Sequence, residues 1–249
     1  MNMLKALNHI LNVLLDLLLD ALRFLSLTVR SGVELRAENL FLRKQMDSQH
    51  WMTFVRNHAK AILACDFFIA VTASFRILYV LVIMEIGTRR IVHFNVTDHP
   101  TSEWTLQQFR EGVQEETDMR FLIHDRDCIY SADLDLSIES TGIKILKTPV
   151  RAPTANAFCE RLIGTFRREC LNFMIPLSDK HLRRILKEWS THYNKGRPHS
   201  SLGPGIPDAV GIAVNPEAPR HQIPKDQNIV SKPILGGLNH EYRLEKAAA

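Results

Sequence analysis

Two kinds of hydrophobic pattern alternate along the middle of the chain. Short, nearly continuous apolar runs predict buried strands at residues 61–70, 76–84, 90–96, 121–124 and 143–147. Longer stretches with apolar residues three or four positions apart predict one helix that opens at Pro100-Thr101 and further helices over residues 131–140, 154–172 and 178–193. The order of these elements predicts an α/β domain with a mixed five-stranded sheet flanked by helices.

The two ends of the chain have other patterns. Leu, Ile, Val, Ala and Phe dominate residues 10–29, and one polar stripe recurs every four positions at Asn8, Asn12, Asp16 and Asp20. Apolar runs of only three residues are too short for a membrane span or a signal peptide. We expect residues 1–48 to be a leucine-rich helical segment that packs or oligomerises, with a membrane-associated helix as the alternative. The core should cover residues 52–208, and residues 209–249, rich in Pro and Gly, should form an irregular tail.

Charge is distributed unevenly along the 249 residues. The chain is 45% hydrophobic and 23% charged, which is ordinary for a globular protein, and its net charge is only +4. Residues 144–199, however, hold twelve Lys and Arg against four acids, a local excess of +8. A basic region beside an acidic site is typical of nucleic-acid enzymes, whereas a solvated helical face is the simpler alternative.

The cysteines do not predict a metal site. Their spacing contains no Cys-x-x-Cys pair, no His pair lies at zinc-finger spacing, and the four positions are Cys65, Cys128, Cys159 and Cys170. We expect small buried packing residues in a reducing compartment.

Three acids stand where a metal site would need them. Asp66 lies within the first apolar strand, Asp125 directly follows the fourth, and Glu160 lies in the helix 154–172, 35 positions after Asp125. A carboxylate at the end of a buried strand is costly unless it is paired or binds a cation. Mg²⁺ prefers carboxylates together with water and phosphate oxygens, so the acids indicate phosphoryl transfer on nucleic acid.

The helix 154–172 carries two stripes. Apolar residues recur at Phe158, Leu162, Phe166 and Cys170, which predicts the buried side. Asn156, Glu160 and Gly164 recur about 200° away on a helix of 3.6 residues per turn. We expect this second stripe to face outward, with Glu160 toward a metal ion and Asn156 toward substrate.

The motifs around these acids resemble the integrase catalytic core of bacterial insertion-sequence transposases and retroviral integrases. Asp125-Arg126-Asp127-Cys128-Ile129-Tyr130 is similar to the family's Asp-x-Gly-x-x-aromatic motif, with Asp127 in place of Gly. Pro153 to Glu160 is similar to its Pro-x-x-Asn-Ala-x-x-Glu pattern, and Arg161, Gly164 and residues 167–171 continue the insertion-sequence form. Tyr193-Asn194, Arg197-Pro198-His199 and Ser201-Leu202-Gly203 resemble the closing motif of the family. The resemblance covers roughly residues 52–208.

The resemblance implies a ribonuclease H-like fold and DNA strand transfer by polynucleotidyl transfer. It implies that Asp66, Asp125 and Glu160 form an Asp-Asp-Glu triad that is catalytic and binds two Mg²⁺ or Mn²⁺ ions. The DNA partners would be the element ends and the target, contacted by Lys144, Lys147, Asn156, Arg161, Arg167, Arg168, Tyr193, Asn194, Arg197 and His199. We expect a bacterial cytoplasmic protein that is nucleoid-associated when bound, a homo-oligomer, and neither a small-molecule substrate nor a membrane partner.

One departure from the family pattern concerns the start of the chain. Related transposases carry a helix-turn-helix region before the core, and none is recognisable between the leucine-rich segment and Trp51. The alternative function is therefore a catalytically idle, truncated transposase remnant that binds DNA or oligomerises.

Overall fold

The computed structural model describes residues 49–113, 118–148, 156–203, 205–208, 223 and 226–246. The chain divides into two units, Met1–Thr53 and Phe54–Ala249. The predicted leucine-rich helix lies outside the described residues. Residues 49–58 are helical and lead into a 3₁₀ turn at Ala59–Ala61. No helix in the described ranges is long and apolar enough to cross a membrane.

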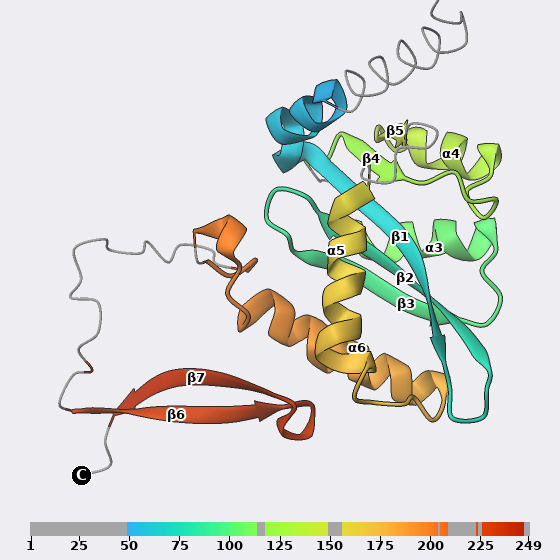
Figure 1. The fold of residues 1–249 in the computed structure, drawn as a ribbon. Coiled ribbons are helices and arrows are strands. Elements are labelled where there is room, and N and C mark those ends of the chain that lie inside the picture. Colours follow the sequence, from blue (N-terminus) through green and yellow to red (C-terminus); the bar gives the residue numbers. More distant parts are fainter. Residues whose placement is uncertain are drawn as a thin grey trace, which may run out of the picture. The chain divides into compact units, whose positions relative to one another are not determined.

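A mixed five-stranded sheet forms the centre of the second unit, in the order β3-β2-β1-β4-β5 (Figure 1). Its strands are β1 (Ile62–Val71), β2 (Ile77–Glu85), β3 (Ile91–Thr97), β4 (Phe121–His124) and β5 (Lys144–Lys147). The first three pair antiparallel, whereas β4 runs parallel to both β1 and β5. The sequence prediction of five strands is confirmed, with boundaries shifted by about one residue, as is usual for strand ends.

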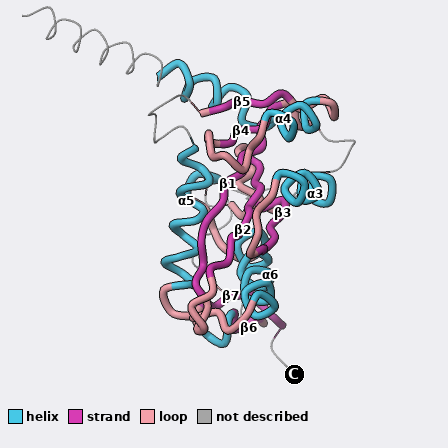
Figure 2. Tube along the Cα trace, turned by 90° about the vertical axis from the view of Figure 1, so that its right-hand side faces the viewer, coloured by secondary structure: helices cyan, strands magenta, loops and turns pink. Residues whose placement is uncertain are grey.

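Helices cover both faces of the sheet. Figure 2 shows α3 (Ser102–Gly112) and α4 (Ala132–Glu139) on the face opposite α5 (Ala157–Phe166). Thr101 and Ser131 begin the first two helices by accepting hydrogen bonds from the backbone N–H groups of Trp104 and Leu134.

On the other face, α5 continues into a π-helical turn at Arg167–Leu171, and Ser178 caps α6 (Asp179–Lys195). Aromatic contacts join the layers there: Phe166 of α5 lies 5.5 Å from Phe68 of β1 and 4.8 Å from Trp189 of α6, measured between ring centroids. The buried stripe predicted for residues 154–172 is thereby confirmed at Leu162, Phe166 and Cys170, whereas Phe158 is only half-buried. A short 3₁₀ turn, Ser200–Leu202, follows α6.

The prediction of an irregular tail is wrong for residues 227–246. These residues form an antiparallel hairpin of β6 (Gln227–Ile234) and β7 (Asn239–Lys246), connected through the turn Leu235–Gly237. Gly236 and Gly237 supply the positive φ angles of that turn, 69° and 98°. The hairpin packs on α6, where Nδ1 of His192 lies 2.9 Å from Oε1 of Glu241.

The cysteine prediction is confirmed in part. Cys65, Cys159 and Cys170 are buried and free, whereas Cys128 is exposed because it lies in the loop that follows Asp125.

Candidate active site

Asp66 occupies the middle of β1, partly buried beneath α5. Its Oδ1 accepts a hydrogen bond of 2.8 Å from the backbone N–H of Phe67. Burial first, and then the charges of Asp125, Glu160 and Asp127, raise the pKa of its carboxyl to about 7, although the hydrogen bond from Phe67 lowers it. Acids from three separate elements therefore act on one another at this point of the sheet.

The parallel pairing of β1 and β4 explains how Asp125 comes near Asp66. The last residues paired between β1 and β4 are Ala64 and Ile123. Asp66 and Asp125 each lie two residues after the paired residue of their own segment. The loop after β4 is held from within: Asp125 Oδ1 accepts from the N–H of Asp127, and Asp127 Oδ1 accepts from the N–H of Ile129, both at 3.1 Å.

His124, which directly precedes Asp125, is a packing residue. It is 1% exposed and stacks on Tyr130 at 4.3 Å between ring centroids. Its Nδ1 lies 2.6 Å from the carbonyl oxygen of Asp125 and its Nε2 lies 3.1 Å from Oδ1 of Asp135. The ring therefore fixes the end of β4 and is not available to a substrate.

Glu160 lies in the first turns of α5 and is exposed. It borders an open trough whose other lining residues come from β1, α5 and the π-helical turn after α5: Phe67, Phe68, Ile69, Ile163, Gly164 and Arg167. Its outward orientation agrees with the predicted second stripe of this helix.

Asn156 corrects that prediction at the other end of the stripe. The side chain is 5% exposed rather than outward, because Asn156 precedes the first helical residue and has non-helical angles, φ −110° and ψ 32°. Its Nδ2 donates to the carbonyl oxygen of Cys65 at 3.0 Å, while its Oδ1 is buried without a hydrogen-bond partner in the described part of the chain. Asn156 thus ties the start of α5 to β1 beside Asp66.

The donor set suits a hard divalent cation. Carboxylate oxygens from Asp66, Asp125 and Glu160 and the unpaired amide oxygen of Asn156 are the ligand type that Mg²⁺ and Mn²⁺ prefer. Within the described ranges, no three His, Cys, Asp or Glu side chains are gathered closely enough to hold a metal ion. Convergence of the three acids on metal stays a prediction.

The arginines of α5 and of the π-helical turn after it lie on the solvent side. Arg167 donates to the carbonyl oxygen of Ile69 at 3.2 Å, and Arg168 donates to Oγ1 of Thr165 at 3.4 Å. Arg161, Arg167 and Arg168 are all exposed, so each can approach a polyanion. On β5, Lys144 and Lys147 are exposed as well, and Nζ of Lys147 lies 2.6 Å from Oδ2 of Asp135.

The closing motif has a largely structural role. Asn194 bridges to β3, since its Oδ1 accepts from the N–H of Ile91 and its Nδ2 donates to the carbonyl oxygen of Ile91, both at 2.9 Å. Arg197 forms a bidentate pair with Glu169, with Nη2 2.6 Å from Oε1. His199 is buried, and its burial, followed by the charge of Arg197, lowers its pKa. In this arrangement, each of the three side chains contacts other groups of the protein.

Tyr193 differs from the rest of the closing motif. Burial raises the pKa of its hydroxyl to about 12, so the group is a neutral donor. The structure also brings Arg89 close to Tyr193, from the turn between β2 and β3. No hydrophobic period or motif singles out Arg89, and only its place in the fold reveals it.

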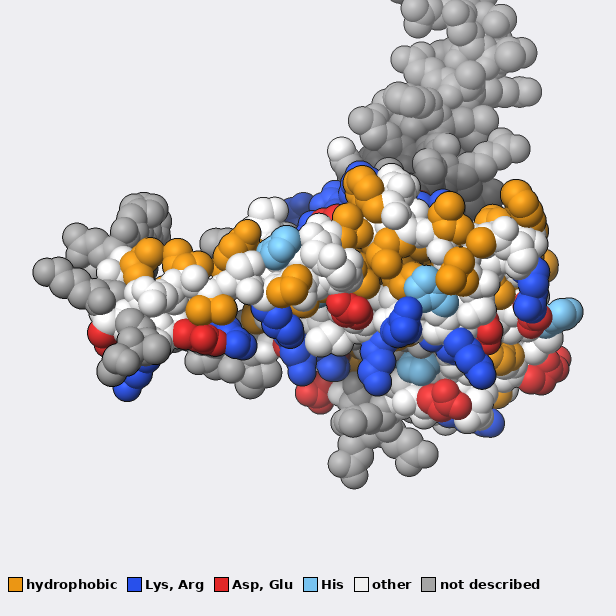
Figure 3. Space-filling view, turned by 90° about the horizontal axis from the view of Figure 1, so that it is seen from below, with side chains coloured by type: hydrophobic (Ala, Val, Ile, Leu, Met, Phe, Trp, Pro, Cys, Tyr) orange, Lys and Arg blue, Asp and Glu red, His pale blue; other side chains and the backbone are white. Residues whose placement is uncertain are grey.

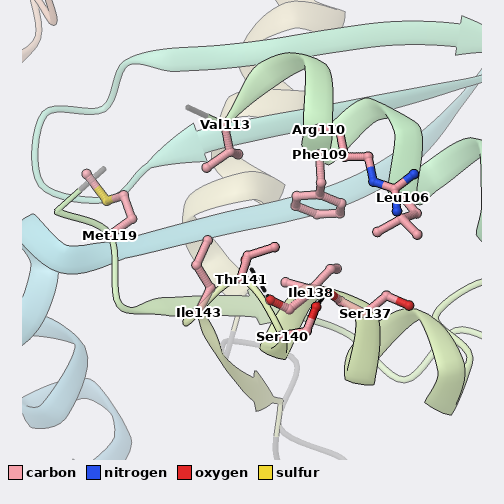
Figure 4. A pocket seen from close by; sticks show the side chains of 10 residues that line it. All are labelled: Leu106, Phe109, Arg110, Val113, Met119, Ser137, Ile138, Ser140, Thr141 and Ile143. Atoms are coloured by element: carbon pink, nitrogen blue, oxygen red, sulfur yellow. Dashed lines mark hydrogen bonds between the residues drawn. The ribbon is translucent and has the colours of Figure 1, made fainter. Parts of the chain in front are cut away.

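A cavity on the other face of the sheet is not part of the candidate site. Figure 4 shows it between α3 and α4, with Phe109 and Leu106 facing Ile138 and Ile143. The hydroxyls of Ser140 and Thr141 donate to backbone carbonyls of α4 at 2.7 Å and do not reach into the space as donors.

Comparisons with known proteins agree with this geometry. Residues 141–207 match the model of the integrase core domain family. Over 62 residues the chain is 44% identical to the insertion element IS476 uncharacterized 39.2 kDa protein of Xanthomonas euvesicatoria. The aligned residues make up 25% of this chain and 18% of that protein. It is 24% identical over 123 residues to the putative transposase InsD for insertion element IS2E of Escherichia coli, covering 46% and 56% of the two chains. The chain thus spans less than two thirds of the length of these relatives.

Solved structures of low sequence identity show the same fold. The simian T-cell lymphotropic virus intasome, in complex with PP2A regulatory subunit B56 gamma, matches with a TM-score of 0.51 and 12% identity, covering 76% of this chain and 79% of that chain. The Mos1 transposase catalytic domain with raltegravir and Mg matches with a TM-score of 0.51 and 12% identity, covering 60% and 81%. The ribonuclease H-like fold is therefore confirmed. Residues 141–207 thus match an integrase core domain, and parts of the chain are similar to proteins of bacterial insertion elements, a putative transposase among them.

Proposed function

We propose that the chain catalyses metal-dependent DNA strand transfer, as a transposase or integrase does, with Asp66, Asp125 and Glu160 as its metal-binding carboxylates. One observation carries the proposal: burial, together with the charges of Asp125 and Glu160 from two other elements, raises the pKa of Asp66 to about 7. Carboxyls that destabilise one another's charge in a partly buried place are a frequent mark of functional sites.

The chain's own residues supply position and charge for this reaction. Asp66 and Asp125 offer oxygens from neighbouring parallel strands, and the bond from Asn156 to Cys65 holds α5 so that Glu160 stays on the same side. Two Mg²⁺ or Mn²⁺ ions, when bound, would make a water or a DNA 3′-hydroxyl nucleophilic and stabilise the leaving oxygen. In this scheme, no protein side chain has to act as nucleophile.

The substrate in this proposal is DNA, both element ends and target. Arg161, Arg167 and Arg168 project from the helix that carries Glu160 and would contact backbone phosphates there, because Arg side chains suit phosphate geometry. Lys144 offers a further exposed cation on β5. The protein would act in the bacterial cytoplasm, at the nucleoid when bound, as a homo-oligomer.

A strand-transfer assay tests the proposal. A labelled duplex with a recessed 3′-hydroxyl end is incubated with a target plasmid in Mg²⁺ or Mn²⁺, comparing wild type, Glu160→Gln and the exposed α3 control Glu103→Gln. We expect Glu160→Gln to form at least about a hundredfold less product than wild type. Loss of a group that only orients a metal ligand costs up to about a hundredfold, so loss of a metal ligand itself should cost at least as much. The control should retain activity.

A non-catalytic DNA-binding or oligomerising protein is the second candidate. The observation that favours it is that no ready metal cluster exists among the described residues. Wild type and Glu160→Gln that bind DNA equally, with no strand-transfer product from either in Mg²⁺ or Mn²⁺, would support it.

A further inference from the structure

The turn between β2 and β3 is tightly built and carries two adjacent arginines. A Cβ on Gly87 would lie 3.0 Å from Cα of Lys60, so the turn passes close to the 3₁₀ turn that precedes β1. Glu85 organises the turn, since it accepts from the hydroxyl of Thr88 at 2.6 Å and from Nη2 of Arg90 at 2.8 Å. The turn therefore presents its side chains in a fixed arrangement.

The two arginines of this turn differ in their partners. Arg90 pairs with Glu85 and has Asp208 at 4.0 Å. Arg89 extends the other way and places its guanidinium over the ring of Phe158 in α5, 4.1 Å from the ring centroid. In the part of the chain that the structure describes, Arg89 forms neither an ion pair nor a hydrogen bond.

The backbone of Arg89 is held in a conformation that its side chain disfavours. Its φ is +65°, in the left-handed region, where a residue with a Cβ costs of the order of 1–3 kcal/mol. Glycine or asparagine would occupy this position with less strain. Such outliers persist where the surrounding structure fixes them, and they gather at functional sites.

The surroundings of Arg89 contain donors without an acceptor. Burial lowers the pKa of its guanidinium, the nearby Tyr193 raises it, and Arg161 lowers it as a second cation. The Tyr193 hydroxyl makes no hydrogen bond to the described residues, and the Arg161 side chain likewise has no partner among them. A half-buried cation beside another cation is costly until an anion joins them.

We propose that Arg89, Arg161 and the Tyr193 hydroxyl form a binding site for a backbone phosphate of DNA. This inference rests on the proposed function and adds a contact to it from an element that carries none of the candidate acids. Phe158 and Arg161 flank Glu160 in α5, so a phosphate held there lies on the strand that passes Glu160. Arg suits the task because its planar guanidinium can stack on Phe158 and still direct N–H groups at phosphate oxygens.

The test measures duplex DNA binding by fluorescence anisotropy over a salt series. The variants are Arg89→Gly and Arg89→Asn, which both tolerate the positive φ, and Arg89→Lys, which keeps the charge. Arg76→Gln is the matched control, because Arg76 directly precedes β2, at the end of that strand far from Arg89, and pairs with Asp98. Inorganic phosphate at constant ionic strength is added as a competitor.

We expect Arg89→Gly and Arg89→Asn to bind DNA more weakly and to lower the slope of log K against log salt by about 0.9, one phosphate contact on duplex DNA. Their melting temperatures should equal or exceed that of wild type, since backbone strain is relieved. Arg89→Lys should also bind more weakly while its slope stays near that of wild type. The control should change neither affinity nor slope.

The outcomes separate this inference from the function on which it rests. Wild type that fails to bind DNA would reject the proposed function itself. If wild type binds DNA, and Arg89→Gly and Arg89→Asn bind it with the same affinity and the same salt slope, the Arg89 site is overturned. The proposed function is then unaffected. Millimolar inorganic phosphate that displaces DNA from wild type but not from these variants would assign the site to free phosphate rather than to DNA.

Discussion

The carboxyl of Asp66 lies where its ionised form is disfavoured, so its ionisation lowers the free energy of unfolding by a measurable amount. The pKa rises from an ordinary value of 3.8 to about 7, so the folded chain holds a proton that the unfolded chain has released. Stability of the metal-free protein should therefore fall as pH rises from about 4 to about 7 and stay low above that range.

Asp66→Asn removes this cost. At pH 8 the metal-free variant should be more stable than wild type by about 2 kcal/mol, a three-unit shift discounted for partial exposure. Urea unfolding at pH 4 and pH 8 measures the difference, which should vanish at pH 4. The exposed Asp118→Asn is the control. A variant less stable than wild type at pH 8 would contradict the assigned environment.

The pair of Arg197 and Glu169 gives a second prediction for single residues. Both side chains are partly buried, and three hydrogen bonds of 2.6 to 3.0 Å join them. Glu169→Gln should destabilise the protein by about 1–3 kcal/mol, because it removes the charge that compensates Arg197. Chemical denaturation measures the loss. The double variant Glu169→Gln, Arg197→Gln should recover part of it, and strict additivity would show that the pair is not coupled.

Among the elements, the hairpin of β6 and β7 depends most on its contact with the rest of the fold. Both strands are largely exposed, and Ile234 and Leu235 are its buried hydrophobic residues, 5% and 6% exposed. A two-stranded hairpin is at best marginally stable alone, so α6 must hold it in place. The N–H of Leu235 donates to Oε1 of Glu188 in α6 at that contact.

Ile234→Ala should release the hairpin. We expect faster amide hydrogen exchange throughout residues 227–246 and a loss of about 2–4 kcal/mol at this contact, as for other buried Ile to Ala changes. Ile229→Ala, in the same strand but 56% exposed, is the control and should leave exchange unchanged. Equal exchange in both variants would show that Ile234 does not anchor the hairpin.

The hairpin also shows what the sequence pattern can and cannot predict. The apolar run of β2 is buried on both faces, so its hydrophobicity alone predicts a central strand. In β6, Pro233 and the exposed positions break the hydrophobic pattern that would predict a strand. A tertiary contact stabilises this strand instead. At the site, strand ends and helix spacing predict Asp125 and Glu160, whereas the burial of Asn156 and the role of Arg89 depend on packing between distant segments.

At the scale of the whole molecule, an exposed apolar surface borders the basic residues that follow Glu160. Large hydrophobic side chains are exposed around the β1–β2 turn and the segment before α6: Ile69, Val71, Phe75, Ile77, Phe173, Ile175 and Leu177. The backbone N–H of Ala73 donates to the carbonyl oxygen of Pro176 at 2.8 Å, which joins these two segments. Figure 3, which views the molecule from that end, shows hydrophobic side chains gathered over part of the surface. Arg167 lies at the border of this surface, since it donates to the carbonyl oxygen of Ile69, and the exposed arginines Arg161, Arg167 and Arg168 are where phosphates would be attracted.

The exposed arginines predict how the protein distinguishes DNA sequences. The exposed cations of α5 can reach phosphates, and phosphate contacts position a protein without reading bases. Arg167→Gln with Arg168→Gln should therefore weaken binding to an element-end duplex and to a scrambled duplex by the same factor, and lower the salt slope by about 1.8 for two contacts. Anisotropy titrations of both duplexes at several salt concentrations measure this. A larger loss on the element-end duplex would mean that these arginines, or the DNA shape they sense, contribute to sequence recognition.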